Sequence, residues 1–166
     1  MIKQIFFIIL SVILFAETDA QTNDFYKIIR IVTNDCCKGV VQHMEKYGLT
    51  VPDRFYICID GIPGLEADYD EGSIYGDMAY HIVTFSMYNS DGWPKWFKKE
   101  VKRGLPYEAF NYILSGNQIT IVVRHESMHY EKGKVVCTLG CWSHYIFEYD
   151  CAKNNWELTD IKFFCI

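Results

Sequence analysis

The sequence has too little positive charge for a typical nucleic-acid-binding protein. Its 166 residues contain 16 lysines and arginines against 21 aspartates and glutamates, so the formal net charge is −5. Proteins that hold a phosphate backbone usually concentrate lysine and arginine in a strong basic excess. The composition therefore predicts no nucleic-acid partner.

Other absences narrow the function further. Only the N-terminus carries a long apolar run, so no membrane span is expected after it. The cysteines do not form two C-x-x-C pairs, which argues against a structural zinc knuckle. The chain has no glycine-rich phosphate loop and no internal repeat. It also lacks an Asn-x-Ser/Thr acceptor for N-glycosylation, which favours a bacterial export compartment over a eukaryotic secretory one.

The N-terminus has the pattern of a secretory signal peptide. Lys3 supplies the positive charge, and a continuous run of apolar or small residues extends from Ile5 to Ala16. Small residues at Thr18 and Ala20 then fit the −3 and −1 positions of a cleavage site. An uncleaved membrane anchor is the alternative, but the run is short for a bilayer span.

We therefore predict a signal peptide over residues 1–20 and a periplasmic or secreted mature protein. Residues 21–166 are enough for a single domain with its own hydrophobic core.

A helix is predicted over residues 23–47, where apolar residues recur at helical spacing. Thr22 or Asn23 is suited to cap its start, and Gly48 is placed to end it. Weak helix formers in its middle, including Gly39, leave a break into two helices open.

Most of the remaining chain alternates with the period of β-strands. A short helix ending at Gly104 interrupts this pattern, with Asp91 as its expected cap and Pro94 in its first turn. A loop rich in glycine and acids is expected over residues 61–76. Strands are expected near residues 55–60, 78–88, 107–115, 118–130, 134–140, 143–151 and 155–165. The class is α+β: an N-terminal amphipathic helix packed on a curved, mostly antiparallel sheet of about six or seven strands, with one short inserted helix.

The stretch His125-Glu126-Ser127-Met128-His129 matches H-E-x-x-H, the zinc signature of many metallopeptidases. In that chemistry the two histidines bind zinc from one face of a helix, and Glu126 acts as the general base. Five consecutive β-branched residues precede the motif, however, and a turn glycine follows at Gly133. This context predicts a strand, on which His125 and His129 lie too far apart to share one ion. Copper or nickel binding by surface histidines is a further alternative.

The predicted short helix has a basic face and an aromatic face. Lys98 and Lys99 belong to the basic face, and Trp93 and Trp96 are the candidate anchors of a partner interface. A surface helix held to the core by its tryptophans is the alternative. For the docking hypothesis we expect substitution of Lys98 and Lys99 by glutamate to weaken partner binding.

Seven cysteines lie after the predicted cleavage site, so at least one thiol is left over if all pairing is internal. A three-residue loop between the last two strands places Cys141 opposite Cys165, and we predict a disulfide there. A four-residue loop, or a bulge at Thr159 and Asp160, would shift that register. Pairing of Cys137 with Cys151, or full reduction of all seven thiols, is the alternative.

The leading functional hypothesis is an exported, non-enzymatic binding protein without a cofactor. An inhibitor or immunity-type partner of another protein is its most concrete form. A small zinc metallopeptidase using His125, Glu126 and His129 is the second hypothesis. The third is a small-ligand binder with a pocket between the sheet and the helix.

Overall fold

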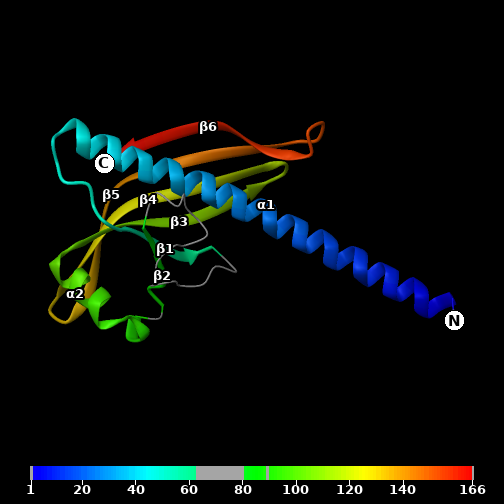
Figure 1. The fold of residues 1–166 in the computed structure, drawn as a ribbon, viewed down its shortest axis with the longest axis horizontal. Helices are drawn as coiled ribbons and strands as arrows, with labels where there is room; N and C mark the ends of the chain where they lie inside the picture. Colours follow the sequence, from blue (N-terminus) through cyan, green and yellow to red (C-terminus); the bar gives the residue numbers. More distant parts are fainter. Residues whose placement is uncertain (1, 63–80, 89, 166) are drawn as a thin grey trace.

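The computed structural model describes residues 2–62, 81–88 and 90–165, and the side chains of the N-terminal helix from Asp24 onward. It shows the predicted α+β arrangement: one long helix, one short helix and an open six-stranded sheet (Figure 1). Most of the predicted acidic loop, from residue 63 onward, lies outside the described residues, and so does the start of the strand predicted from residue 78.

Helix α1 spans Ile2–Lys46 without interruption. Its C-terminal half lies across the sheet and its N-terminal half extends beyond it (Figure 1). The expected caps at Thr22 and Asn23 are therefore interior positions, and Gly39 does not break the helix. The predicted signal peptide remains a prediction. Among the helices whose side chains are described, none combines the length and apolar character of a membrane span.

The end of α1 is where the sequence places it. Gly48 has a φ of 65°, a left-handed conformation that glycine adopts readily. Its amide donates to the carbonyl of Glu45, and the amide of Leu49 donates to that of Met44, at 3.1 and 2.8 Å. These two bonds form a Schellman motif, which satisfies carbonyls at the helix end and turns the chain toward the sheet.

The sheet has the strand order β2-β1-β3-β4-β5-β6. Strand β1 pairs in parallel with both of its neighbours, and the other pairs are antiparallel. The strands are β1 (Phe55–Gly61), β2 (Ile82–Phe85), β3 (Leu105–Ser115), β4 (Gln118–Glu131), β5 (Lys134–Asp150) and β6 (Asn155–Cys165).

Two predicted strands, 134–140 and 143–151, are one strand in the structure. Strand β5 continues through Gly140, which is the extra residue of a β-bulge: His125 pairs with Cys141, and Glu126 pairs with Leu139. The predicted bend at this glycine is therefore a bulge that bends the strand without ending it.

Each face of the sheet is covered by its own helix. Buried side chains of α1 pack on one face together with β1, β3, β4 and β5; the group includes Ile28, Ile29, Val32, Ile57, Phe110, Ile121, Val123 and Phe147. Helix α2 (Lys95–Arg103) packs on the other face. The buried group on that face includes Cys58, Val83, Phe85, Trp93, Phe97, Val101, Leu105 and Met128. Burying each large apolar side chain contributes about 1.5–3 kcal/mol, so both helices are held mainly by these contacts.

Helix α2 begins differently from the expectation. Pro94 precedes it and no side chain caps its first turn, whereas Asp91 belongs to a short 3-10 turn, η1 (Ser90–Gly92). Gly104, with a φ of 91°, follows its last residue as expected. The aromatic contacts of Trp93 and Phe97 with Phe85 hold this segment against the sheet.

The predicted disulfide between Cys141 and Cys165 is present. The loop before β6 has four residues, because Asp150 pairs with Asn155, and this alone would misalign the two cysteines. A bulge at Thr159 then restores the register, since Ile146 pairs with Asp160. The four-residue loop and the bulge at Thr159 therefore both occur, and their effects on the register of Cys141 and Cys165 cancel.

The other five cysteines are unpaired thiols. Cys36, Cys37 and Cys58 are buried, whereas Cys137 and Cys151 are exposed and do not form the rival disulfide. Burial raises the pKa of both Cys37 and Cys58 to about 12, because desolvation disfavours the thiolate.

The thiol environments predict which cysteines react with iodoacetamide at pH 8 without reductant. Cys137 and Cys151 should be alkylated first, and the three buried thiols roughly a hundredfold more slowly, since the thiolate is the reactive form. Cys141 and Cys165 should react only after reduction. Peptide mass mapping over time measures the order, and early labelling of Cys165 would contradict the pairing.

A close backbone contact makes Gly61 irreplaceable in β1. A Cβ atom there would collide with the carbonyl oxygen of Phe110 on β3, whereas one at Gly39 in α1 meets open space. We expect Gly61→Ala to lower the free energy of unfolding by more than about 2 kcal/mol. The matched change Gly39→Ala should raise it by about 0.5–1 kcal/mol. Urea denaturation measures both, and a wild-type midpoint for Gly61→Ala would refute the contact.

Candidate functional site

A cavity of about 350 Å³ lies between α1 and the sheet, near the start of β1 and β3. Its wall draws on one helix, four strands and the segment before β1: Thr33, Cys36, Cys37, Val40, Pro52, Arg54, Phe55, Tyr56, Ile57, Pro106, Tyr107, Glu108, His125, Glu126, Ser127, Thr138 and Gly140.

The cavity lies where the strands depart from regular pairing. Strands β1 and β3 pair only from Ile57 and Glu108 onward, so the residues before them are not joined in the ladder. On the other side, the bulge at Gly140 bends β5 opposite His125. Where the pairing is irregular, side chains form the adjoining wall of the cavity. Bulges often lie beside functional sites.

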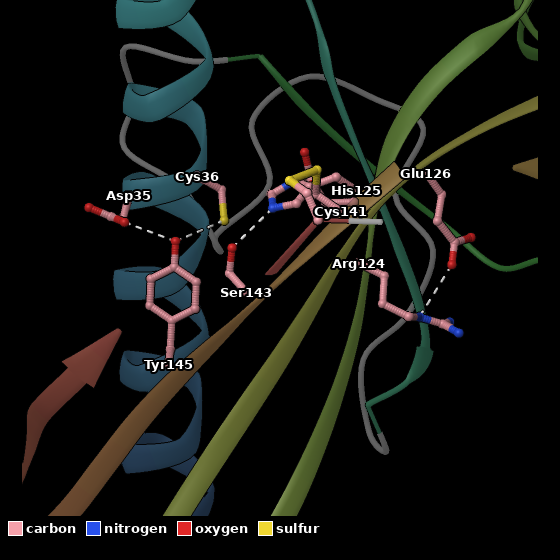
Figure 2. Close-up of polar contacts among 10 residues, drawn as sticks. Asp35, Cys36, Arg124, His125, Glu126, Cys141, Ser143 and Tyr145 are labelled. Atoms are coloured by element: carbon pink, nitrogen blue, oxygen red, sulfur yellow. Dashed lines mark hydrogen bonds and ion pairs between the residues drawn. A yellow bond between two sulfur atoms is a disulfide. The ribbon is translucent and has the colours of Figure 1, made fainter. Parts of the chain in front are cut away.

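A chain of three polar side chains crosses strands β3, β4 and β5 at this wall. The carboxylate Oε2 of Glu108 lies 2.6 Å from His125 Nδ1. On the other side of the ring, His125 Nε2 lies 3.1 Å from the Ser143 hydroxyl (Figure 2). Glu108 is directly opposite His125 in the β3–β4 register. Both ring nitrogens of His125 are therefore engaged by the protein itself.

This chain has the connectivity of an acid–histidine–serine triad, but its serine is not placed to attack a substrate. Ser143 is only 4% exposed and does not line the cavity. The ring of Phe163 on β6 also packs 5.8 Å from that of His125. A nucleophile must reach the reacting carbon, so the chain serves to fix the orientation of His125 and to satisfy the buried Ser143.

Sequence reasoning missed Glu108 and Ser143. The signal for Glu108 was available, because the predicted two-residue turn after Ser115 sets a register that pairs it with His125. The relation of Ser143 to His125 depends on the bulge at Gly140, which alternation alone does not locate.

Two lining residues of the cavity, Thr33 and Glu108, each have a buried oxygen, Oγ1 and Oε2, without a hydrogen-bond partner among the described residues. Thr33 is 0% exposed, and its Oγ1 has no hydrogen-bond partner among the described residues. A buried hydroxyl without a partner costs roughly 1–3 kcal/mol of stability.

A second polar cluster fastens α1 to β5 beside the cavity. The Tyr145 hydroxyl donates to Asp35 at 2.9 Å and lies 3.4 Å from Cys36 Sγ (Figure 2). Burial, followed by the proximity of Cys36 and Asp35, raises the pKa of Tyr145. Burial also raises the pKa of Cys36. Both groups are therefore neutral at physiological pH, and Cys36 is a structural thiol.

The H-E-x-x-H motif lies in a strand, as its context predicts. Residues 125–129 belong to β4, which pairs with β5 through a tight turn at Lys132 and Gly133. Over four residues of a strand, His125 and His129 are separated by roughly 13 Å, at about 3.3 Å per residue. Within the described parts of the chain, no three His, Cys, Asp or Glu side chains are grouped to hold a metal ion.

Glu126 has a different environment from that of a zinc peptidase base. It accepts a hydrogen bond from the Tyr107 hydroxyl, and its Oε1 lies 3.3 Å from Arg124 Nε (Figure 2). The helix that a zinc metallopeptidase site requires is therefore not formed at residues 125–129, and the carboxylate of Glu126 is held by Tyr107 and Arg124.

The predicted partner-binding residues separate into two groups. Trp93 is 3% exposed and donates through Nε1 to the carbonyl of Ser86 at 2.8 Å, so it belongs to the core and cannot anchor a partner. Trp96 is 37% exposed. The reason is helical geometry: the face of α2 that carries Phe97 and Val101 turns toward the sheet, and Trp96 lies at its margin.

Trp96 lies among cations. The Arg54 guanidinium is 5.2 Å from its ring, and Lys95 and Lys99 are exposed on the same helix. We refer to Arg54, Lys95, Trp96 and Lys99 as the α2 surface. Lys98 is partly buried and donates to the carbonyl of Asp91 at 3.0 Å, so it also has a structural role.

Strand β6 presents an apolar stripe that the sequence did not reveal. Leu158, Ile161 and Phe163 pair with residues of β5 that face α1, yet they are 39%, 46% and 64% exposed. The strand is the last in the order of the described sheet, and Trp156 near its start packs against the α1 core. Contiguous exposed apolar side chains of this kind mark contact surfaces.

No family model matches the chain, and neither the curated proteins nor the solved structures contain a significant match.

Proposed function

We propose that this chain is an exported binding protein whose partner is another protein with an acidic surface. The observation that carries the proposal is the α2 surface. There, a tryptophan remains 37% exposed beside an arginine and two exposed lysines. An inhibitor or immunity-type protein is the most concrete form of this function.

The charge of α2 supports an acidic partner. The helix has five basic residues and one acidic residue, in a chain whose formal net charge is −5. A local positive surface on an acidic protein orients it toward a negative partner and accelerates the encounter.

The aromatic residue supports a protein as the partner. Tryptophan and arginine are the residue types most enriched among interface hot spots, and the Trp96–Arg54 pair supplies both. The apolar stripe on β6 is a second, separate surface of the kind that contacts other chains.

The arrangement of α1 is compatible with export. The N-terminal half of α1 extends away from the sheet (Figure 1). Among the residues of α1 whose side chains are described, Ile28 is the first that is fully buried in the core. Cleavage after Ala20 would therefore leave the core described above intact.

We expect Lys95→Glu combined with Lys99→Glu, and separately Trp96→Ala, to lower partner affinity at least tenfold. The melting temperature of the lysine variant should change little, because exposed charges contribute little to stability. The control is Lys38→Glu with Lys162→Glu, which makes the same charge change at exposed positions on α1 and β6. Affinity is measured by calorimetry with a partner isolated by crosslinking to the wild-type protein in its native host.

The proposal requires one protein that is lost in both α2 variants and retained by the control. Equal affinity of all four proteins for that partner would refute docking through α2. Equal weakening by the lysine variant and the control would show that only net charge matters.

A further inference from the structure

We propose that β6 pairs in antiparallel fashion with β6 of a second copy of this chain, so that two sheets join into one across a two-fold axis. This interface is independent of the α2 surface. The proposal rests on three features of β6: an edge that no described strand covers, an exposed apolar stripe, and an order of charges that complements itself.

The outer edge of β6 is accessible to another strand. The strand has 11 residues and is last in the order of the described sheet, and no strand among the described residues pairs with its outer side. Every residue from Leu158 to Cys165 is exposed. By contrast, β2 at the other end of that order has four residues, all buried. A long exposed edge accepts a further strand through main-chain hydrogen bonds.

This edge is already ordered before any partner binds. The disulfide between Cys165 and Cys141 fastens the end of β6 to β5. At the bulge, the Thr159 hydroxyl donates to the carbonyl of Ile146 at 3.1 Å. A strand that is held in place loses little conformational freedom when it associates.

The bulge determines which residues of β6 share a face. Leu158, Ile161 and Phe163 lie on the face toward α1, and Asp160 and Lys162 lie on the opposite face. A two-fold axis at Ile161 places this residue opposite its own copy. On the same face it places Leu158 of each chain opposite Phe163 of the other. Exposed apolar side chains therefore meet apolar side chains, and each contact outside the axis occurs twice.

The charges of Asp160 and Lys162 select this register. Within one chain, Lys162 Nζ lies 3.6 Å from Asp160 Oδ2, and about half of each side chain is exposed. With the axis at Ile161, Asp160 of each chain also lies opposite Lys162 of the other. Moving the axis by one residue would place either Asp160 opposite Asp160 or Lys162 opposite Lys162, and like charges directly opposite each other are destabilising. This self-complementarity favours a second copy over an unrelated strand.

Sedimentation equilibrium of the mature protein, residues 21–166 with the disulfide intact, tests the dimer. The wild-type mass should reach twice that of the chain as concentration rises. Ile161→Lys should weaken dimerisation about tenfold or more, because it removes the central apolar pair and places two like charges at the axis. The matched control is Ile113→Lys, at an exposed isoleucine of β3, which should dimerise as the wild type does.

An exchange of charges tests the register. Asp160→Lys and Lys162→Asp should each weaken the dimer, although they change the net charge in opposite directions, because each creates like-charge pairs. An equimolar mixture of the two variants should form a heterodimer, since opposite charges then face each other throughout. The double variant Asp160→Lys with Lys162→Asp should dimerise as the wild type does. Both side chains are exposed, so these variants should remain folded.

A wild-type protein that stays monomeric up to millimolar concentration would overturn the proposal, and the edge of β6 would then be left for a strand of a different protein. A dimer that Ile161→Lys leaves as tight as its control does would also overturn it. If neither the mixture nor the double variant restores the dimer, the register centred on Ile161 is wrong. The wild-type mass decides whether the dimer exists even if a variant fails to fold.

Discussion

The packing of α1 against one face of the sheet is the interaction on which the rest of the structure depends. Ile28, Ile29 and Val32 are almost completely buried in it, and the Asp35–Tyr145 hydrogen bond fixes the helix along β5. One helix is too narrow to cover six strands, since its diameter with side chains is about 10–12 Å. Its coverage is therefore incomplete: on β6, Trp156 packs against the α1 core, whereas Leu158, Ile161 and Phe163 remain exposed.

Both unusual features of that face follow from this incomplete coverage. The apolar stripe of β6 is left exposed beside α1, and the cavity lies between α1 and the irregular start of the strands. The opposite face has no such shortfall around α2, because Trp93, Phe97 and Phe85 fill it with aromatic rings. On this helix, Trp96 is exposed at the margin of the buried face and lies among cations.

The sequence predicted the elements that depend on local signals. The glycine after α1 and the turn at Gly133 were placed correctly. The helix and strand periods identified the elements, except that α1 begins before residue 23 and that the two strands predicted over 134–140 and 143–151 are one strand, β5. The Cys141–Cys165 pair was also correct, although the assumed loop was one residue too short and the bulge at Thr159 compensated for it. Bulges are set by how strands twist and pack, so alternation suggests their position without fixing their effect on register.

Features that depend on three-dimensional packing were not predictable to the same degree. The sequence alone does not distinguish Trp93 from Trp96. The direction in which α2 packs against the sheet buries Trp93 and leaves Trp96 exposed. A pocket between helix and sheet was expected as a possibility, but its wall at Thr33 and Glu108 required the structure. Xenon pressurisation of crystals tests the incomplete coverage by α1 most directly, because xenon enters accessible apolar cavities. The account predicts a bound xenon atom beside Val40 and Ile57, and side chains filling that space in the same crystals would contradict it.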